Sequence, residues 1–174
     1  MSRWRRAALA HSHPWRAWLT WRASLTARLR AHAPGFRVEV VRQGLRLPHE
    51  DEWREVGAGT RSHVLVREVL LHLRGGPVVM AHSIASVRDL AGPWRSLRGL
   101  GSRPLAEALF SDPEVVREPL EHARLDARHP LHGRACALLG VALPPLWARR
   151  SRFTKRGRPL LVTEVFLPRL LDRP

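Results

Sequence analysis

Two charged residues interrupt apolar strand patterns and are therefore candidates for binding or catalysis. Arg67 lies within the segment LVREVLL (65–71), and Glu164 lies within LLVTEVF (160–166). Alternate side chains of a strand point to the same face, so each charge would share its face with apolar neighbours. A charge buried alone costs several kcal/mol. We therefore expect each to have a partner, which can be the other charge, a different polar group or a ligand.

The two residue types suit two different groups of a ligand. An arginine can donate hydrogen bonds to both oxygens of a carboxylate, and a glutamate can orient a hydroxyl group or assist proton movement. The patterns leave an alternative open, in which Glu68 and Thr163 point inward and Arg67 is solvated. Both strands are apolar on both faces, so periodicity does not decide between the two orientations.

Most of the chain is predicted to form strands that pair as hairpins. Turn-forming residues separate two pairs of strand-like segments, Gly75-Gly76-Pro77 in the first pair and Arg156-Gly157 in the second. Consecutive hairpins favour an antiparallel sheet. The expected strands are 36–42, 62–73, 77–86, 115–125, 146–155 and 158–168.

Helices are expected to pack on this sheet. The segment 14–32 has amphipathic spacing and is predicted to be one helix. The segment 103–110 is predicted to be a short helix with Pro104 at its start. Residues 87–102 are expected to form a loop or short helical turns, and residues 129–145 a connecting loop with about one helical turn.

The fold class is therefore α+β, a single antiparallel sheet of about six strands with helices packed on it. The chain has 174 residues, of which 44% are hydrophobic and 26% charged, and this is ordinary for one globular domain. We expect residues 1–174 to form that domain, with 1–13 and 169–174 as loose tails. No apolar run approaches the roughly 20 residues that span a bilayer, and no signal peptide is recognisable.

The net charge of +15 raises nucleic acid or an anionic membrane as a partner. However, Lys155 is the single lysine among 30 basic residues, and the arginines are spread along nearly the whole chain. That distribution favours coding bias over a nucleic-acid footprint, so no specific nucleic-acid partner is expected. Cys136 is the single cysteine, which excludes an intramolecular disulfide and a cysteine metal cluster and suits a reducing cytoplasm.

Histidine spacing also argues against a metal site. Of the ten histidines, His11 and His13 form one close pair, and His129 and His132 another. Neither pair has a third ligand at close spacing, so we expect no bound metal and a solvated position for these side chains.

Three sequence blocks resemble the bacterial chorismate lyases of ubiquinone biosynthesis. The blocks have the order and spacing of that family, and the C-terminal block is the most specific. Weaker similarity extends to SLTARL (24–29) and VEVVRQG (38–44), so the resemblance covers residues 24–168. The three blocks are LVREVLL (65–71), RPLAEALF (103–110) and LWARRSRF with GRPLLVTEVFLP (146–153 and 157–168).

The resemblance implies an antiparallel sheet with helices and the cleavage of chorismate to 4-hydroxybenzoate and pyruvate, without metal or organic cofactor. It implies that Arg67 binds the ring carboxylate and that Glu164 meets the hydroxyl end of the ring, which makes both catalytic candidates. It further implies a backbone contact from Leu105 and a contact from Leu25, where the family has methionine. We expect a cytoplasmic monomer without an integral membrane segment.

Two other functions remain as alternatives. The effector-binding domains of some bacterial transcription regulators resemble chorismate lyase in fold, so the chain could be a ligand-binding module without catalysis. A single predicted helix before residue 36 leaves no room for a helix-turn-helix, which counts against a regulator. The basic cluster at 149–158, with Trp147 and Phe153 interleaved, could bind nucleic acid. A solvated hairpin is favoured, in which Arg149 or Arg150 can help to bind the second carboxylate of chorismate.

Overall fold

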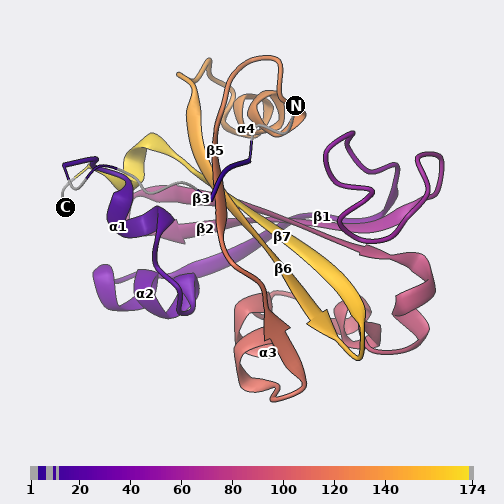
Figure 1. Cartoon of the computed structure of the whole chain (residues 1–174). Helices are drawn as coiled ribbons and strands as arrows, with labels where there is room; N and C mark the ends of the chain where they lie inside the picture. The colour runs from indigo at the N-terminus through magenta and orange to yellow at the C-terminus, as the bar shows by residue number, and fades with distance from the viewer. Residues whose placement is uncertain (1–3, 7–9, 11, 173–174) are drawn as a thin grey trace.

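The computed structural model describes residues 4–6, 10 and 12–172. Within these residues, seven strands form one antiparallel sheet in the order β1-β2-β3-β7-β6-β4, and β5 also pairs with β6 (Figure 1). The strands are β1 (Arg37–Arg46), β2 (Val64–Leu73), β3 (Gly76–Ser86), β4 (Val115–Arg117), β5 (Glu121–Leu125), β6 (Leu146–Lys155) and β7 (Arg158–Phe166). The helices are α1 (Arg16–Leu19), α2 (Leu25–His32), α3 (Leu105–Ser111) and α4 (Pro130–Leu139), with 3₁₀ turns η1 (Val87–Ala91), η2 (Arg95–Gly99) and η3 (Pro168–Leu170).

The predicted α+β fold with a single antiparallel sheet is confirmed, but the number of strands differs. The described chain has seven strands because the predicted strand 115–125 is divided into β4 and β5. Pro119 lies between the two pieces, and a proline has no N–H to donate to a ladder. Both pieces still pair with β6, so together they form one interrupted edge of the sheet.

Both predicted hairpins are present, and β7 joins them. The β6–β7 turn has Arg156 at φ 50° and Gly157 at φ 72°, the left-handed conformation that two-residue hairpin turns require. The last strand, β7, pairs with β6 on one side and with β3 on the other. Residues 67 and 164 are therefore separated by one strand, β3.

The sheet is covered on both faces. Leu19 and Leu25 from α1 and α2 pack with Phe166 on one face. On the other face, Leu131 of α4 packs with Leu70, and Figure 1 shows α2 and α3 on the opposite side of the sheet from α4. Every residue of β2 is consequently buried. Arg67 and Glu68 are thus both inside the protein, on opposite faces, so the alternative in which Arg67 is solvated is wrong.

The predicted helix 14–32 is wrong as a single element, because it is broken at residues 20–24. The hydroxyl of Ser24 accepts a hydrogen bond of 3.2 Å from the backbone N–H of Ala27 and so caps a new helix, α2. The amphipathic spacing continues across the break, which explains why periodicity alone predicted one helix.

The connecting loop predicted at 129–145 is also wrong, because it contains the ten-residue helix α4. Pro130 lies in its first turn, and the His129 ring accepts a hydrogen bond from the N–H of Leu131. Gly140 ends it in the left-handed conformation, at φ 67°. Proline at the start and glycine at the end are typical helix boundaries.

The predicted loose tails are packed where the structure describes them. Trp4 and Leu170 are buried in the two opposite cores, and Arg5 makes two backbone hydrogen bonds with His122. The expectation is wrong at these positions, because both ends carry apolar side chains that the core accepts. Residues 1–3, 7–9, 11 and 173–174 lie outside the described residues. Among the described helices, none has the length and apolar character needed to cross a membrane.

Candidate active site

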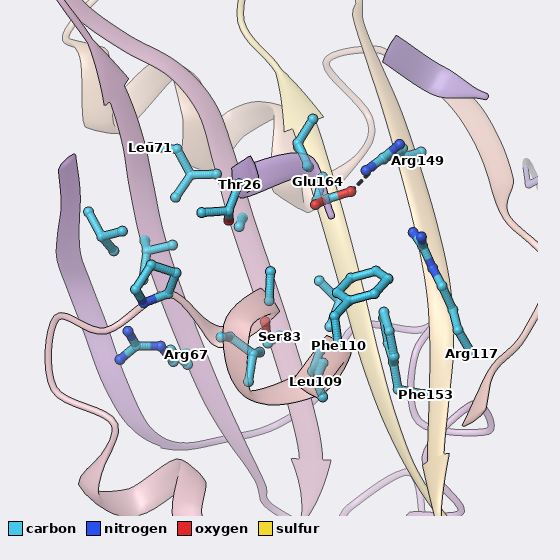
Figure 2. Close-up of a pocket in the computed structure, with 18 residues that line it drawn as sticks. Thr26, Arg67, Leu71, Ser83, Leu109, Phe110, Arg117, Arg149, Phe153 and Glu164 are labelled. Carbon is cyan, nitrogen blue, oxygen red and sulfur yellow. Dashed lines mark hydrogen bonds and ion pairs between the residues drawn. The ribbon is translucent and has the colours of Figure 1, made fainter. Parts of the chain in front are cut away.

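The four predicted site residues line one cavity between the sheet and helices α2 and α3. Leu25 is the first residue of α2, Leu105 is the first residue of α3, Arg67 is on β2 and Glu164 is on β7. Figure 2 shows Arg67 on one side of this cavity and Glu164 on the other. Between them the wall is mainly apolar and includes Val38, Val69, Leu71, Ala81, Pro104, Leu109, Phe110, Phe153 and Val162.

Arg67 is held by neutral oxygen atoms alone. Its guanidinium donates to Oε1 of Gln43 at 2.9 Å and to the carbonyls of Gly101 and Arg103 at 2.8 and 3.3 Å. Gln43 is itself fixed, because its amide N–H donates to the carbonyl of Leu97. Arg67 is 4% exposed, and burial lowers its pKa. No carboxylate of the described residues forms an ion pair with it, so its positive charge is available to an anionic ligand.

Glu164 faces Arg149, its direct partner in the β6–β7 register. The Nε–H of Arg149 donates to the carboxylate of Glu164. Its Nη1 donates to the carbonyls of Trp18 and Trp21 at 2.8 and 2.6 Å. Those two carbonyls belong to the end of α1 and the linker before α2, so the break in the predicted helix supplies acceptors for this arginine.

The solvated hairpin expected at 149–158 is therefore wrong at its first two residues. Arg149 is 0% exposed, and Arg150 is buried on the opposite face. There Arg150 contacts the carboxylates of Glu121 and Glu55 at 2.9 and 3.0 Å. Helices and loops cover both faces of β6, and a strand pattern by itself does not reveal such a cover.

Arg67 and Glu164 do not pair with each other. Arg67 is opposite Ser83 of β3, and Glu164 is opposite Ala81 of the same strand. Strands lie about 4.8 Å apart, so the two backbones are separated by roughly 10 Å across the sheet. Each residue instead has the different partners described above, which leaves the space between them to a ligand.

A third arginine, Arg117 on β4, lines the same cavity and was not predicted. Its guanidinium lies over the rings of Phe110 and Phe153, 5.4 and 5.3 Å from their centroids, and Nη1 donates to the carbonyl of Arg22. Burial lowers the pKa of Arg117 to about 10, and the nearby charge of Arg149 acts in the same direction. The sequence signal was weak, because β4 is only three residues long.

The charges of the cavity are strongly unbalanced. Three guanidinium groups and one carboxylate line it, which gives a net charge of +2 on otherwise apolar walls. Thr26 and Ser83 add two hydroxyl groups. Such a cavity suits a small, partly apolar molecule that carries two negative charges.

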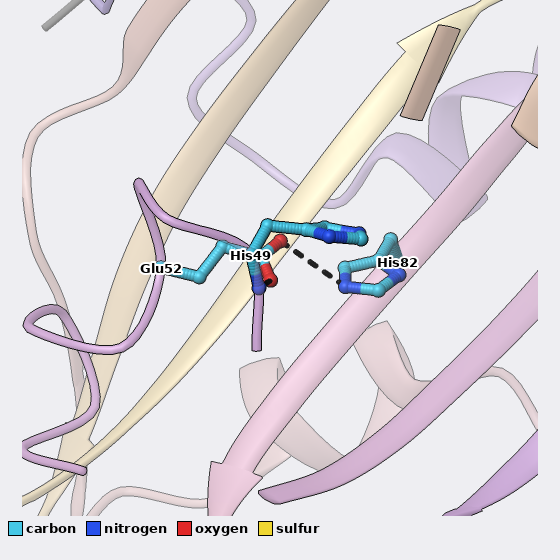
Figure 3. Close-up of side chains that lie close together, drawn as sticks. All are labelled: His49, Glu52 and His82. Carbon is cyan, nitrogen blue, oxygen red and sulfur yellow. Dashed lines mark hydrogen bonds and ion pairs between the residues drawn. The ribbon is translucent and has the colours of Figure 1, made fainter. Parts of the chain in front are cut away.

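A second buried polar cluster lies on the other face of the sheet. His82 is between two carboxylates. Its Nε2 is 3.1 Å from Glu52 (Figure 3), and its Nδ1 is 3.3 Å from Glu68. Burial alone would lower the pKa of His82, but the negative charges of Glu52 and Glu68 and the hydrogen bonding of the imidazole N–H groups to their carboxylates outweigh it and raise the pKa to about 9. The neighbours of His82 in β3, Ala81 and Ser83, point to the cavity, so the sheet separates the two sites.

This cluster is also the place in the described structure where a metal ion could be held. Ligand atoms of His49, Glu52 and His82 lie within 4.8 Å of one another. His82 lies far from His49 and Glu52 in the sequence, which explains why histidine spacing did not indicate the cluster. The expected solvation of His129 and His132 is wrong, since both are buried next to hydrogen-bond partners, while His11 lies outside the described residues.

Known proteins resemble this chain along its whole length. The family described as chorismate lyase matches residues 2–174. A protein of Ralstonia nicotianae named probable chorismate pyruvate-lyase is 50% identical over 160 residues, covering 90% of this chain and 82% of that protein. A protein of Nitrosospira multiformis with the same name is 44% identical over 173 residues, covering 99% and 96%. The chain belongs to the chorismate lyase family.

Solved structures show that this chorismate lyase family member shares its fold with regulators. PhnF from Mycobacterium smegmatis aligns with a TM-score of 0.58 at 18% identity, over 85% of this chain and 65% of that chain. A GntR-family transcriptional regulator from Bacillus cereus aligns with a TM-score of 0.54 at 12% identity, over 80% and 96%. At these identities the likeness concerns the fold, so the function has to be argued from the cavity.

Proposed function

We propose that this member of the chorismate lyase family converts chorismate to 4-hydroxybenzoate and pyruvate. The observation that carries the proposal is the placement of Arg67 and Glu164 on opposite sides of one apolar cavity. It is supported by relatives at 44–50% identity that are named probable chorismate pyruvate-lyase. The net charge of +2 also matches a substrate with two carboxylates.

Each of the four predicted site residues has a role in this proposal. Arg67 binds the ring carboxylate with two hydrogen bonds, and Glu164 accepts one from the ring hydroxyl. Leu25 and Leu105 are the first residues of their helices, so their backbone N–H groups have no acceptor within the helix and can donate to the ligand. Because this contact is made by the backbone, Leu25 can provide it as well as the methionine that the family has at this position.

The reaction needs few chemical groups from the protein. The ether C–O bond to the ring breaks, the ring loses the hydrogen of the hydroxyl-bearing carbon as a proton, and the leaving enolpyruvate gains a proton to become pyruvate. Aromatisation supplies the driving force. The protein therefore contributes mainly positioning and charge stabilisation, and in this proposal Glu164 receives the proton.

Incubation with chorismate tests the proposal. We expect 4-hydroxybenzoate, followed by its absorbance, and pyruvate, followed by a coupled dehydrogenase, to form in equal amounts. Activity should survive treatment with a chelator, and Arg67→Met serves as the inactive control. A rate no higher than that of chorismate alone would contradict the enzymatic function and favour a non-catalytic ligand-binding module. Loss of activity on chelation, restored by one metal, would contradict the cofactor-free reaction.

We further propose that the product enters ubiquinone biosynthesis in the cytoplasm. The support is the family resemblance and the single cysteine, which suits a reducing compartment. A strain lacking the gene should fail to make ubiquinone unless 4-hydroxybenzoate is supplied.

A further inference from the structure

Two arginines on the Glu164 side of the cavity carry N–H groups without an acceptor. The Nε of Arg117 and the Nη2 of Arg149 are buried and have no hydrogen-bond partner among the described residues. Leaving a buried donor of a charged group unpaired costs more than its bond would contribute. Both side chains line the cavity, and Figure 2 shows them on the same side of it.

The charges on this side are also incompletely paired. Arg149 is paired with Glu164, but no described carboxylate forms an ion pair with Arg117. Arg117 is instead held by the carbonyl of Arg22 and by two aromatic rings, none of which neutralises its charge. On the opposite side, Arg67 is likewise held by neutral oxygen atoms that do not neutralise its charge. The cavity thus has two uncompensated positive charges, one on each side.

The proposed substrate and product differ in the number of carboxylates. Chorismate has one on the ring and one on the enolpyruvyl group, whereas 4-hydroxybenzoate has only the first. If Arg67 binds the ring carboxylate, the second uncompensated charge matches the group that leaves. The enolpyruvyl ether is attached next to the hydroxyl-bearing carbon, so its carboxylate lies on the side where Glu164, Arg149 and Arg117 gather.

We infer that Arg117, together with the free Nη2 of Arg149, binds the enolpyruvyl carboxylate of the substrate. The inference rests on the proposed chorismate lyase activity and adds a subsite to it. This subsite recognises the substrate and not the aromatic product, because pyruvate takes the second carboxylate away. Arg117 therefore contributes to selection of the substrate, whereas Arg67 contributes to binding of both molecules.

The test compares the two ligands in Arg117→Gln. We expect kcat/KM for chorismate to fall by about 10- to 100-fold, the effect of losing one or two charge-assisted hydrogen bonds. The Kd of 4-hydroxybenzoate, measured by calorimetry, should change by less than about twofold. Arg117→Lys should recover part of the loss, because it keeps the charge but not the forked geometry.

Two controls separate the subsite from other causes. Arg124→Gln removes the same charge from an exposed position on β5, so it reports the loss of long-range attraction alone, and kcat/KM should stay near that of the parent. Unchanged binding of 4-hydroxybenzoate shows that Arg117→Gln is folded. If that variant does not fold, Arg117→Lys alone must still show the selective loss.

The outcomes distinguish this inference from the proposed function. A parent protein without turnover would contradict the function itself. A parent that turns over chorismate, with an Arg117→Gln variant of unchanged kcat/KM, would overturn the subsite only. Equal losses for chorismate and 4-hydroxybenzoate would also overturn it, because they would show a structural contribution of Arg117 to the whole cavity.

Discussion

Replacing Arg67 by methionine should remove binding of the ring carboxylate while leaving the fold intact. Arg67 donates to three neutral oxygens and has no ion-pair partner among the described residues. Its removal therefore leaves no unpaired buried charge, which is the change that costs a protein most. Methionine is unbranched and flexible, so it fills the space of the arginine stem. We expect the free energy of unfolding to change by less than about 2 kcal/mol.

The loss of affinity can be estimated from the contact that disappears. A two-pronged contact consists of two hydrogen bonds to a charged group, each worth about 1.5–3 kcal/mol. Arg67→Met should thus weaken binding of 4-hydroxybenzoate by about 3–6 kcal/mol. Arg67→Lys keeps a charge and one contact, and should weaken it by about 1.5–3 kcal/mol.

A matched ligand isolates this contact. Calorimetry with 4-hydroxybenzoate and with its uncharged amide, 4-hydroxybenzamide, in the parent and in Arg67→Met forms a double-mutant cycle. The parent should strongly prefer the acid, and Arg67→Met should not discriminate between the two. Urea unfolding of each protein checks the fold. A variant that prefers the acid as strongly as the parent would refute the assignment of Arg67 to the carboxylate.

Two further predictions concern the hydroxyl side of the cavity and the opposite face of the sheet. Glu164→Gln keeps size and hydrogen bonding but accepts no proton, so kcat should fall by about 10²–10⁴-fold with little change in affinity for 4-hydroxybenzoate; a small fall accompanied by weaker binding would instead indicate that Glu164 orients the hydroxyl. The pKa of His82 is about 9 in the folded protein against 6.5 for an ordinary histidine. Its ion pairs with Glu52 and Glu68 therefore stabilise the fold fully below pH 6.5, and this contribution is lost as the pH rises through 9. The free energy of unfolding should fall by roughly 1–3 kcal/mol over that range. Urea unfolding at pH 6.5 and 9.5 measures this loss, and a His82→Gln variant with the same pH dependence as the parent would show that another group is responsible.

The sequence by itself determined the features that depend on neighbouring residues. The β6–β7 hairpin follows from Arg156-Gly157, which accept the left-handed conformation of a tight turn. The helix after Pro104 was also predictable, because its boundary is local. The alternation of side chains identified Arg67 and Glu164 as charges in apolar stripes, and the resemblance to a family gave them roles. The boundaries of α4 are also marked in the sequence, by Pro130 at its start and Gly140 at its end, although a loop was predicted there.

Only the tertiary structure decided which charges share the cavity. The order of strands places β7 between β3 and β6. The β3–β7 contact joins distant segments and brings Glu164 into the cavity that Arg67 lines, together with its hairpin neighbour Arg149. The break before Ser24 frees the carbonyls of Trp18 and Trp21 for the same arginine. Periodicity cannot show such pairings, because it reports which residues share a face and not what covers that face. The position of Arg117 in the cavity could not be predicted either. Its strand, β4, has three residues and almost no pattern of its own, and pairing with β6 sets its position.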